Sequence, residues 1–310
     1  MKSNSAHSFR WFESRKDKMN FSLRYALTFA LSLSPVILFS FAAEASRSTQ
    51  EELNGTARLD MAQEFCSAFV INVGRTDDAK AILATNGHCI RDPLLTATEV
   101  VGNFKFEGSA GIYGQTVSGY SEIVGSGIQV LYGTMKGTDV GILEIPTTNG
   151  ELKQKGIHIF SLGEAPSPKS EIKVVSGAWR ETYVGSVIGT ELTIHEGSWE
   201  WINSFSFSDE LSRIRGGYSG SPILDSAGNV VGILNTVFAG TSDACSEDNP
   251  CEVGKNGEKL TFAQRVYGQQ IVGIKSCFGK AGEFDLSLKN CPLPAITQLR
   301  ASGRISLGLI

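Results

Sequence analysis

The sequence predicts an all-β fold, and two observations carry this prediction. Short apolar or alternating runs recur after residue 45, with Gly, Asn and Ser between them, a pattern typical of short strands joined by turns. Helical periodicity longer than two turns is hard to find outside the N-terminal 45 residues. The pattern suits a fold of two β-barrels. We predict strands over residues 69–73, 81–84, 99–106, 121–124, 140–145, 172–175, 183–188, 230–234 and 270–274.

The N-terminal 45 residues differ from the rest of the chain. Residues 1–24 are polar and lean basic, and residues 25–42 are largely apolar. The following Ala-Glu-Ala has the small-x-small form of a signal-peptidase site, so we predict a secretory leader over residues 1–45 that is cleaved before Ser46. A retained membrane anchor is the alternative, because the apolar stretch is nearly long enough to span a bilayer. Met19 is an alternative start of the chain.

A glycine-rich segment presents a candidate nucleophile. The sequence GGYSGSP at residues 216–222 places Ser219 in a turn just before the apolar pair Ile223-Leu224. Glycines on both sides permit backbone angles that other residues resist, and they let a substrate carbonyl approach main-chain N–H groups. A simple turn at the end of a hairpin is the alternative for this segment alone. Because a serine hydroxyl is a weak nucleophile, a base and an orienting acid are needed elsewhere in the chain.

A histidine and an aspartate stand out as partners for this serine. His88 lies at the end of the run AILATNGHC, in which an apolar strand gives way to small residues that leave the imidazole room. Asp139 stands at the head of an alternating strand, where a fixed carboxylate suits the task of orienting an imidazole. A turn-capping aspartate is the alternative. The other three histidines occur in ordinary polar or alternating surroundings: His7, His158 and His195.

Together, the three motifs resemble those of the chymotrypsin/trypsin-like serine protease family. ATNGHC is similar to the family's histidine motif, TDVGIL to its aspartate motif and GGYSGSP to its serine motif. The order His, Asp, Ser is that of the chymotrypsin type and differs from the orders in α/β-hydrolases and subtilisins. The separations of 51 and 80 residues fit one barrel's length of chain between successive members. The resemblance extends from about Glu64 to about Cys277.

The resemblance implies two six-stranded antiparallel β-barrels with the active site between them. Residues 46–150 would form the N-terminal barrel with the histidine and the aspartate, and residues 151–277 the C-terminal barrel with the serine and the specificity pocket. We place the junction near residues 147–170, where the composition is typical of a linker. Residues 278–310 would be a tail tied by a disulfide, in which residues 292–310 are either a short helix or mobile.

The activity that the resemblance implies is peptide hydrolysis through an acyl-enzyme. Ser219 would attack the scissile carbonyl, His88 would take its proton, and Asp139 would fix the imidazole tautomer. The backbone N–H groups of Gly217 and Ser219 would form the oxyanion hole. The alternative is an exported trypsin-like module that binds a partner without cleaving it. Family members of that kind usually lack a triad residue, whereas all three are present here.

Two departures from the family pattern affect activation and specificity. Trypsin-type enzymes carry an acidic residue just before the serine, which pairs with a newly released amino terminus; here that residue is Tyr218, so we predict no activation by that ion pair. The pattern GxSGSP is closer to the bacterial glutamyl-endopeptidase branch, but the pocket histidine of that branch aligns with Leu234.

The resemblance also indicates where substrate would bind. It places Arg213 at or near the floor of the specificity pocket, where a guanidinium would favour an acidic substrate side chain. The alternative is that Arg213 points to solvent. It places three further residues in the substrate-binding wall: Asn235, Thr236 and Val237.

All six cysteines lie after the predicted leader. An even number of cysteines in an exported chain indicates disulfides, and six cysteines allow fifteen pairings. The resemblance implies that the cysteine after His88 is bonded to the one in the strand before it. Nearest-neighbour pairing of the others then gives the full set: Cys66–Cys89, Cys245–Cys251 and Cys277–Cys291. A zinc site is disfavoured, because there is no CxxC pair and the histidines are scattered.

The charge of the chain excludes some classes of partner. The net charge is −4, and the predicted leader carries +3, which leaves −7 on the mature chain. An acidic chain without a basic cluster is a poor candidate for nucleic-acid binding, and no dinucleotide or P-loop signature is present. We therefore expect a secreted or periplasmic monomer that acts on proteins or peptides. We expect it to need no cofactor or metal and to leave the membrane after leader cleavage.

Overall fold

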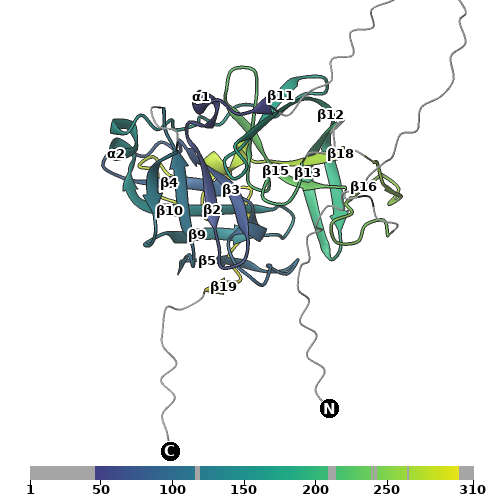
Figure 1. Ribbon diagram of the computed structural model, residues 1–310. Helices are drawn as coiled ribbons and strands as arrows, with labels where there is room; N and C mark the ends of the chain where they lie inside the picture. The colour runs from purple at the N-terminus through teal and green to yellow at the C-terminus, as the bar shows by residue number, and fades with distance from the viewer. Residues whose placement is uncertain are drawn as a thin grey trace, which may run out of the picture. The chain divides into compact units, whose positions relative to one another are not determined.

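Two β-sheets, antiparallel except where β19 pairs with β5, contain most of the regular secondary structure of the described residues (Figure 1). The computed structural model describes residues 46–115, 119–208, 214–238, 240, 243–263 and 265–299. The predicted leader and Arg213 therefore lie outside the described residues. All the described residues fall in one compact unit. The all-β prediction is confirmed.

The first sheet has ten strands, in the order β19-β5-β9-β10-β4-β3-β2-β7-β8, with β6 paired to β9. Its strands are β2 (Thr56–Asp60), β3 (Phe65–Ile71), β4 (Lys80–Thr85), β5 (Val100–Gly102), β6 (Phe104–Lys105), β7 (Ser109–Tyr113), β8 (Tyr120–Val124), β9 (Gln129–Thr134), β10 (Val140–Thr148) and β19 (Gln298–Leu299). The apolar run that forms β3 is buried from its second residue to its last, so this strand lies at the centre of the protein.

The second sheet has nine strands, in the order β11-β14-β15-β18-β13-β12-β16-β17, with β1 paired to β12. Its strands are β1 (Ser46–Arg47), β11 (Glu171–Ser176), β12 (Glu181–Glu196), β13 (Trp199–Ser208), β14 (Pro222–Leu224), β15 (Val230–Val237), β16 (Cys251–Val253), β17 (Lys259–Leu260) and β18 (Arg265–Gln270). The hairpin expected after the serine turn is present as β14 and β15.

Helices are short in the described part of the chain. They are α1 (Gln50–Leu53), α2 (Asn149–Gln154) and the 3₁₀ turns Gly87–Cys89 and Val272–Cys277. Both α-helices begin at a threonine whose side chain and a glutamate three residues later form a capping box. No helix within the described ranges is long and apolar enough to cross a membrane.

Some details of the architecture differ from the expectation. The described residues give sheets of ten and nine strands where the resemblance implies six each, because short segments add to them: β6 and β19 in the first sheet, and β1, β16 and β17 in the second. Residues 46–47, assigned to the N-terminal barrel, pair with β12 of the second sheet. In the tail, β19 pairs in parallel with β5, so residues 298–299 form a strand and not a helix.

The predicted strand over residues 270–274 is wrong. β18 ends at Gln270, and a 3₁₀ helix follows over Val272–Cys277. Ile274 and Cys277 are both buried, and a spacing of three residues puts them on one face of a 3₁₀ helix. The apolar residues of this segment therefore have helical spacing and not the alternation of a strand.

The long β12–β13 hairpin packs the second sheet against the first. Trp201 is buried in the same apolar cluster as the first sheet's Cys89 and Ile90. The indole N–H groups of Trp199 and Trp201 donate to the Leu95 and Met135 carbonyls at 2.9 and 3.1 Å. These contacts fix the second sheet beside the loops that end β4 and precede β10.

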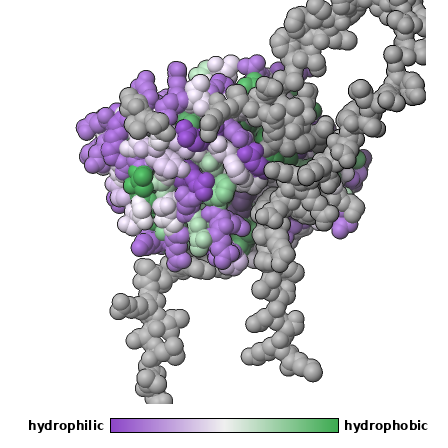
Figure 2. All heavy atoms as spheres, viewed as in Figure 1, coloured by the Kyte–Doolittle hydropathy of each residue, from purple (hydrophilic) through white to green (hydrophobic). Residues whose placement is uncertain are grey.

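All six cysteines form disulfides, in the pairs expected from the sequence: Cys66–Cys89, Cys245–Cys251 and Cys277–Cys291. The described surface in Figure 2 is mainly hydrophilic, with small separate hydrophobic areas. Disulfides of this number are typical of proteins in oxidising compartments.

Candidate active site

The pairing of β4 with β10 brings His88 and Asp139 together. Gly141 in β10 pairs with Thr85, the last residue of β4. Because the strands are antiparallel, the chain just after β4 lies beside the chain just before β10. His88 follows β4 in the 3₁₀ turn, and Asp139 directly precedes β10. Sheet register thus makes neighbours of two residues 51 positions apart.

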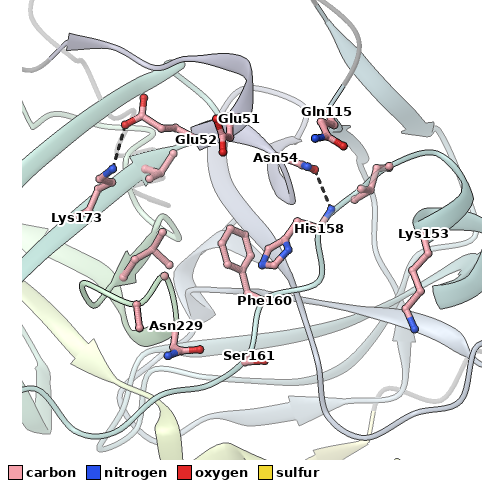
Figure 3. A pocket seen from close by; sticks show the side chains of 16 residues that line it. Glu51, Glu52, Asn54, Gln115, Lys153, His158, Phe160, Ser161, Lys173 and Asn229 are labelled. Atoms are coloured by element: carbon pink, nitrogen blue, oxygen red, sulfur yellow. Dashed lines mark hydrogen bonds and ion pairs between the residues drawn. The ribbon is translucent and has the colours of Figure 1, made fainter.

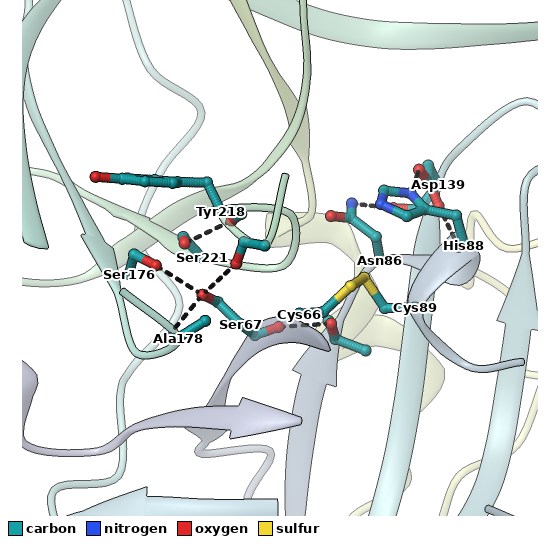
Figure 4. The surroundings of a disulfide bond; sticks show 12 residues. Cys66, Ser67, Asn86, His88, Cys89, Asp139, Ser176, Ala178, Tyr218 and Ser221 are labelled. Atoms are coloured by element: carbon teal, nitrogen blue, oxygen red, sulfur yellow. Dashed lines mark hydrogen bonds and ion pairs between the residues drawn. A yellow bond between two sulfur atoms is a disulfide. The ribbon is translucent and has the colours of Figure 1, made fainter. Parts of the chain in front are cut away.

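Asp139 contacts His88 through both of its carboxylate oxygens (Figure 4). Its Oδ2 lies 2.6 Å from His88 Nδ1, and its Oδ1 accepts the His88 backbone N–H at 3.1 Å. The Asp139 side chain is fully buried, whereas that of His88 is 22% exposed. A carboxylate at Nδ1 favours the tautomer with the proton on Nδ1, which leaves Nε2 as a base.

The acidic surroundings also change the pKa of His88. Burial alone lowers it, but the charge and hydrogen bond of Asp139 raise it, and Glu196 and Glu64 raise it further. The net effect is a pKa above the usual 6.5. A stronger base at Nε2 suits proton abstraction from a hydroxyl.

Gly87 permits the close approach of these segments. A Cβ at this position would lie 1.9 Å from the Thr134 carbonyl oxygen and 3.0 Å from Asp139 Oδ1. No side chain fits there without moving the β9 backbone. The glycine before His88 in the NGHC motif is thus required by packing.

The serine turn is fixed to the first sheet by its backbone. The Ser67 N–H in β3 donates to the Ser219 carbonyl at 2.8 Å. At Gly220, where φ is +82°, a Cβ would lie 2.0 Å from the Ser67 carbonyl oxygen. Since Ser67 follows Cys66, and Cys66 is bonded to Cys89, one disulfide links the strand under Ser219 to the turn that carries His88.

Two N–H groups of the turn have no partner among the described residues. The N–H groups of Tyr218, Gly220 and Ser221 donate to backbone carbonyls at 2.9–3.1 Å. Those of Gly217 and Ser219 make no hydrogen bond among the described residues, and neither does the Ser219 hydroxyl. In unliganded enzymes the contact between nucleophile and base is often long and tightens with substrate.

The other expected binding residues lie at the end of β15. Asn235 is buried and its Oδ1 has no hydrogen-bond partner in the described part of the chain, while Thr236 and Val237 are partly exposed. Pairing of β15 with β14 ends at Ile233, whereas pairing with β18 continues to Val237. One edge of the last three residues is therefore without a neighbouring strand in the described chain.

Glu196, at the end of β12, is an acid that nothing in the surrounding sequence distinguishes. It is 6% exposed, and its Oε1 accepts the Asp248 N–H at 2.9 Å. Its Oε2 has no hydrogen-bond partner among the described residues. Burial raises the pKa of Glu196 to about 7, although the Thr236 hydroxyl, the Asp248 N–H and the charge of His88 lower it. It acts on His88 through its charge.

Two other features of the described residues do not add to this site. His88 lies within 4.8 Å of both sulfurs of Cys66 and Cys89, but these sulfurs are joined in a disulfide and offer no thiolate. A cavity of about 620 Å³ lies elsewhere (Figure 3) and is lined by neither His88, Asp139 nor Ser219.

A His–Asp pair on one sheet beside a serine turn from another is the arrangement expected of a trypsin-type serine protease. The family model of the trypsin-like peptidase domain matches residues 66–233, more than half of the chain. The protein belongs to this family.

Comparisons with individual proteins are more distant. The active form of the Rv3671c protease from M. tuberculosis is 12% identical, with a TM-score of 0.46, over 87% of this chain and 97% of that one. A Glu endopeptidase in complex with MPD is 14% identical, with a TM-score of 0.44, over 76% and 93%. The MamO protease domain from Magnetospirillum magneticum is 13% identical, with a TM-score of 0.42, over 71% and 92%. A sequence search of curated proteins gives no match.

At this level of similarity, the substrates and active states of those proteins do not transfer to this chain. The family assignment therefore rests on the family model, and the roles of individual residues rest on the geometry of this site.

Proposed function

We propose that the protein is an exported serine endopeptidase that uses His88, Asp139 and Ser219. The observation that carries the proposal is the 2.6 Å contact between His88 Nδ1 and Asp139 Oδ2. It lies where β4 ends and β10 begins, in the sheet to which the Ser219 turn is hydrogen-bonded. A fully buried carboxylate that contacts both Nδ1 and the backbone N–H of His88 suits the orienting role.

The reaction follows from these positions. Ser219 Oγ attacks the scissile carbonyl while His88 Nε2 takes its proton, and the imidazolium is stabilised by Asp139. The charge that develops on the carbonyl oxygen is received by the N–H groups of Gly217 and Ser219, which have no partner among the described residues. His88 then gives its proton to the leaving amine, and water hydrolyses the acyl-enzyme by the reverse use of the same groups.

An extended substrate would lie along the open edge of β15. Backbone groups at residues 235–237 have a strand on one side only within the described chain. A peptide paired there would add a strand, which gives affinity through main-chain hydrogen bonds and leaves side chains to determine specificity. Arg213 stays a prediction for the floor of the specificity pocket, since it lies outside the described residues.

Export is supported by the cysteines and by the leader predicted from the sequence. All three disulfides are formed, and no free cysteine occurs in the described part of the chain. Bonds of this kind persist outside the reducing cytosol. We infer a periplasmic or extracellular location.

Covalent labelling tests the proposal. A fluorophosphonate should label the purified, oxidised protein at Ser219, and Ser219→Ala should abolish both labelling and peptide cleavage. Absence of label on the wild-type protein, or label that persists in Ser219→Ala, would overturn the proposal and favour a non-cleaving binding module. Cleavage of a peptide library by the same preparation would identify the preferred side chain.

A further inference from the structure

Tyr218, the residue before the proposed nucleophile, is held by a carboxylate from the second sheet. Its ring is buried, with 1% exposed, and its hydroxyl donates a hydrogen bond to Glu181 Oε2. Burial and the neighbouring carboxylate both raise the pKa of Tyr218, so the hydroxyl remains a donor. Glu181, at the start of β12, also accepts hydrogen bonds from both terminal nitrogens of Arg215, each at 3.1 Å.

The same carboxylate is connected to the glycines of the turn through Arg215. The Arg215 guanidinium lies 3.9 Å from the ring centroid of Trp179, a distance at which cation and ring attract. The Trp179 indole N–H donates to the Gly216 carbonyl at 2.8 Å. At Gly217, where φ is +89°, a Cβ would lie 2.4 Å from the ring of Phe65 and 2.9 Å from Trp179 Nε1. The turn is thus held from both sides.

These contacts set the direction of the N–H groups of Gly217 and Ser219, which have no partner among the described residues. In a planar trans peptide unit, the C=O and the N–H of the next residue point in opposite directions. Trp179 holds the Gly216 carbonyl, so the Gly217 N–H points away from the indole. The backbone N–H and hydroxyl of Ser221 hold the Tyr218 carbonyl at 2.9 and 2.6 Å, so the Ser219 N–H points away from them.

We propose that Glu181 is a positioning residue for the oxyanion hole. It fixes Tyr218 and Arg215, and through them it keeps the N–H groups of Gly217 and Ser219 directed at the substrate carbonyl. This inference rests on the proposed function. Where trypsin-type enzymes order this turn with a newly released amino terminus, here the ordering carboxylate is part of strand β12 and is present without cleavage of the chain.

Two conservative variants test the role of this carboxylate. Glu181→Gln removes the charge that holds Arg215, and Tyr218→Phe removes only a buried hydroxyl, with little change of volume. In each, kcat should fall about 10- to 100-fold, because small displacements of a site cost up to about 10² in rate. KM should stay within about twofold. Labelling by a fluorophosphonate should slow by a similar factor, because its phosphoryl oxygen occupies the oxyanion position.

The two changes should not be additive, since both break one chain of contacts. The double variant should therefore have a kcat close to that of the slower single variant. Backbone amide exchange over residues 214–221 should become faster in both single variants, a readout that does not depend on catalysis.

The Lys173–Glu52 ion pair provides a matched control. Its nitrogen–oxygen distance is 3.1 Å and its side chains are 41% and 25% exposed, against 3.1 Å, 41% and 27% for Arg215–Glu181. It lies at the cavity drawn in Figure 3, which none of the triad residues line. Glu52→Gln should leave kcat and exchange over residues 214–221 unchanged.

The outcomes separate this inference from the proposed function. If wild-type protein is labelled at Ser219 but both variants keep its kcat and its exchange rates, the role of Glu181 is overturned and the protease assignment stands. A loss of activity that is equally large in Glu52→Gln would also overturn it, since the effect would then be one of general stability. Failure of the wild-type protein to label overturns both.

Discussion

The two sheets bring groups to the site in opposite states. On the first sheet, the His88 backbone N–H, its Nδ1 and both oxygens of Asp139 are all engaged with one another. On the second, two N–H groups and the hydroxyl of the serine turn have no partner among the described residues. In the proposed mechanism, the base and its orienting acid are thus fixed before substrate arrives, whereas the nucleophile and the two oxyanion donors are left open for it.

This difference has a physical reason. An unpaired buried carboxylate is costly, so Asp139 is stable at full burial only with its hydrogen bonds made. Ser219 is partly exposed, so its N–H is hydrated at little cost until a carbonyl oxygen replaces the water. A site that prepares both kinds of group in advance lowers the reorganisation needed during reaction.

The largest expected effect on activity comes from a change in the His88–Asp139 pair, whose hydrogen bonds are already made. Asp139→Asn keeps the shape of the side chain but presents an amide where a charge and an acceptor are needed, so His88 is held in the wrong tautomer. We expect kcat/KM to fall by about 10⁴-fold, measured with the best peptide from library profiling. The control is Asp60→Asn, at an acid of the first sheet whose side chain is 44% exposed, which should change activity little. A loss under tenfold at Asp139 would mean that the His–Asp pair is not the working base.

Activity should be almost as sensitive to a change in the serine turn, whose N–H groups are left open. Gly217→Ala places a Cβ 2.4 Å from the Phe65 ring at a φ of +89°, so the turn must shift and the Gly217 N–H with it. Loss of one oxyanion donor lowers kcat by about 10²–10³-fold, with KM little changed.

Gly228→Ala is the matched control for this substitution. It has a φ of +81°, but a Cβ there would meet nothing within 4 Å. Its backbone strain is therefore similar, and it lies in the β14–β15 turn away from the site. If both alanine variants lose activity equally, strain and not oxyanion geometry explains the Gly217 result.

Sequence alone indicated those parts of the candidate site that are local. His88, Asp139 and Ser219 each stand in a short motif whose residues lie together in the fold, and Gly87 and Gly217 are visible as glycines beside them. Alternation indicated the strands with one buried face. The disulfide of Cys66 and Cys89 followed from the family resemblance, and the structure has it.

The residues that sequence missed depend on register between distant strands. Glu181 and Glu196 are the first and last residues of the 16-residue strand β12, and nothing in ETYVG or TIHEG distinguishes a buried acid from an exposed one. Their roles depend on the fold. Glu181 contacts Tyr218 of the serine turn, and the charge of Glu196 acts on His88. The 3₁₀ helix at Val272–Cys277 was missed because four apolar residues in eight fit both a strand and a tight helix.

Removing the disulfide that links the His88 turn to the strand beside the serine turn should have a smaller effect, mainly on stability. The Cys66–Cys89 disulfide joins residues 23 apart, and Cys245–Cys251 joins residues 6 apart. Because the entropy removed from the unfolded chain grows with loop length, replacing the first pair by alanine should cost about 3 kcal/mol and the second about 2 kcal/mol. Urea unfolding under non-reducing conditions measures both.

Activity distinguishes the two disulfides more sharply than stability does. Cys66 precedes Ser67, whose N–H holds the Ser219 carbonyl, and Cys89 follows His88. Removing this disulfide should lower kcat even where the protein stays folded, whereas removing Cys245–Cys251 should affect kcat less. Equal kcat in the two double variants would show that backbone hydrogen bonds alone align the two sheets.

The smallest expected effect is a shift in the pH dependence of activity. It comes from Glu196, which is neither fully hydrogen-bonded like Asp139 nor open like the serine turn. Glu196 is buried like Asp139, but one of its oxygens has no hydrogen-bond partner in the described chain. Its charge helps to raise the pKa of His88, so in Glu196→Gln that pKa should fall. Activity needs neutral His88, and the acid limb of kcat/KM, which reports the free enzyme, should therefore move to lower pH. Glu200→Gln removes the same charge from an exposed position on the same hairpin and should leave the acid limb closer to its wild-type pH.

Stability provides a second readout for Glu196. With a pKa of about 7 in the folded protein against 4.5 normally, Glu196 binds a proton more tightly when folded. Its contribution is thus full below pH 4.5 and is lost as the pH rises through 7, on the order of 3 kcal/mol in total. Glu196→Gln should lack this loss, and an unchanged slope of unfolding free energy between pH 5 and 7 would contradict the raised pKa.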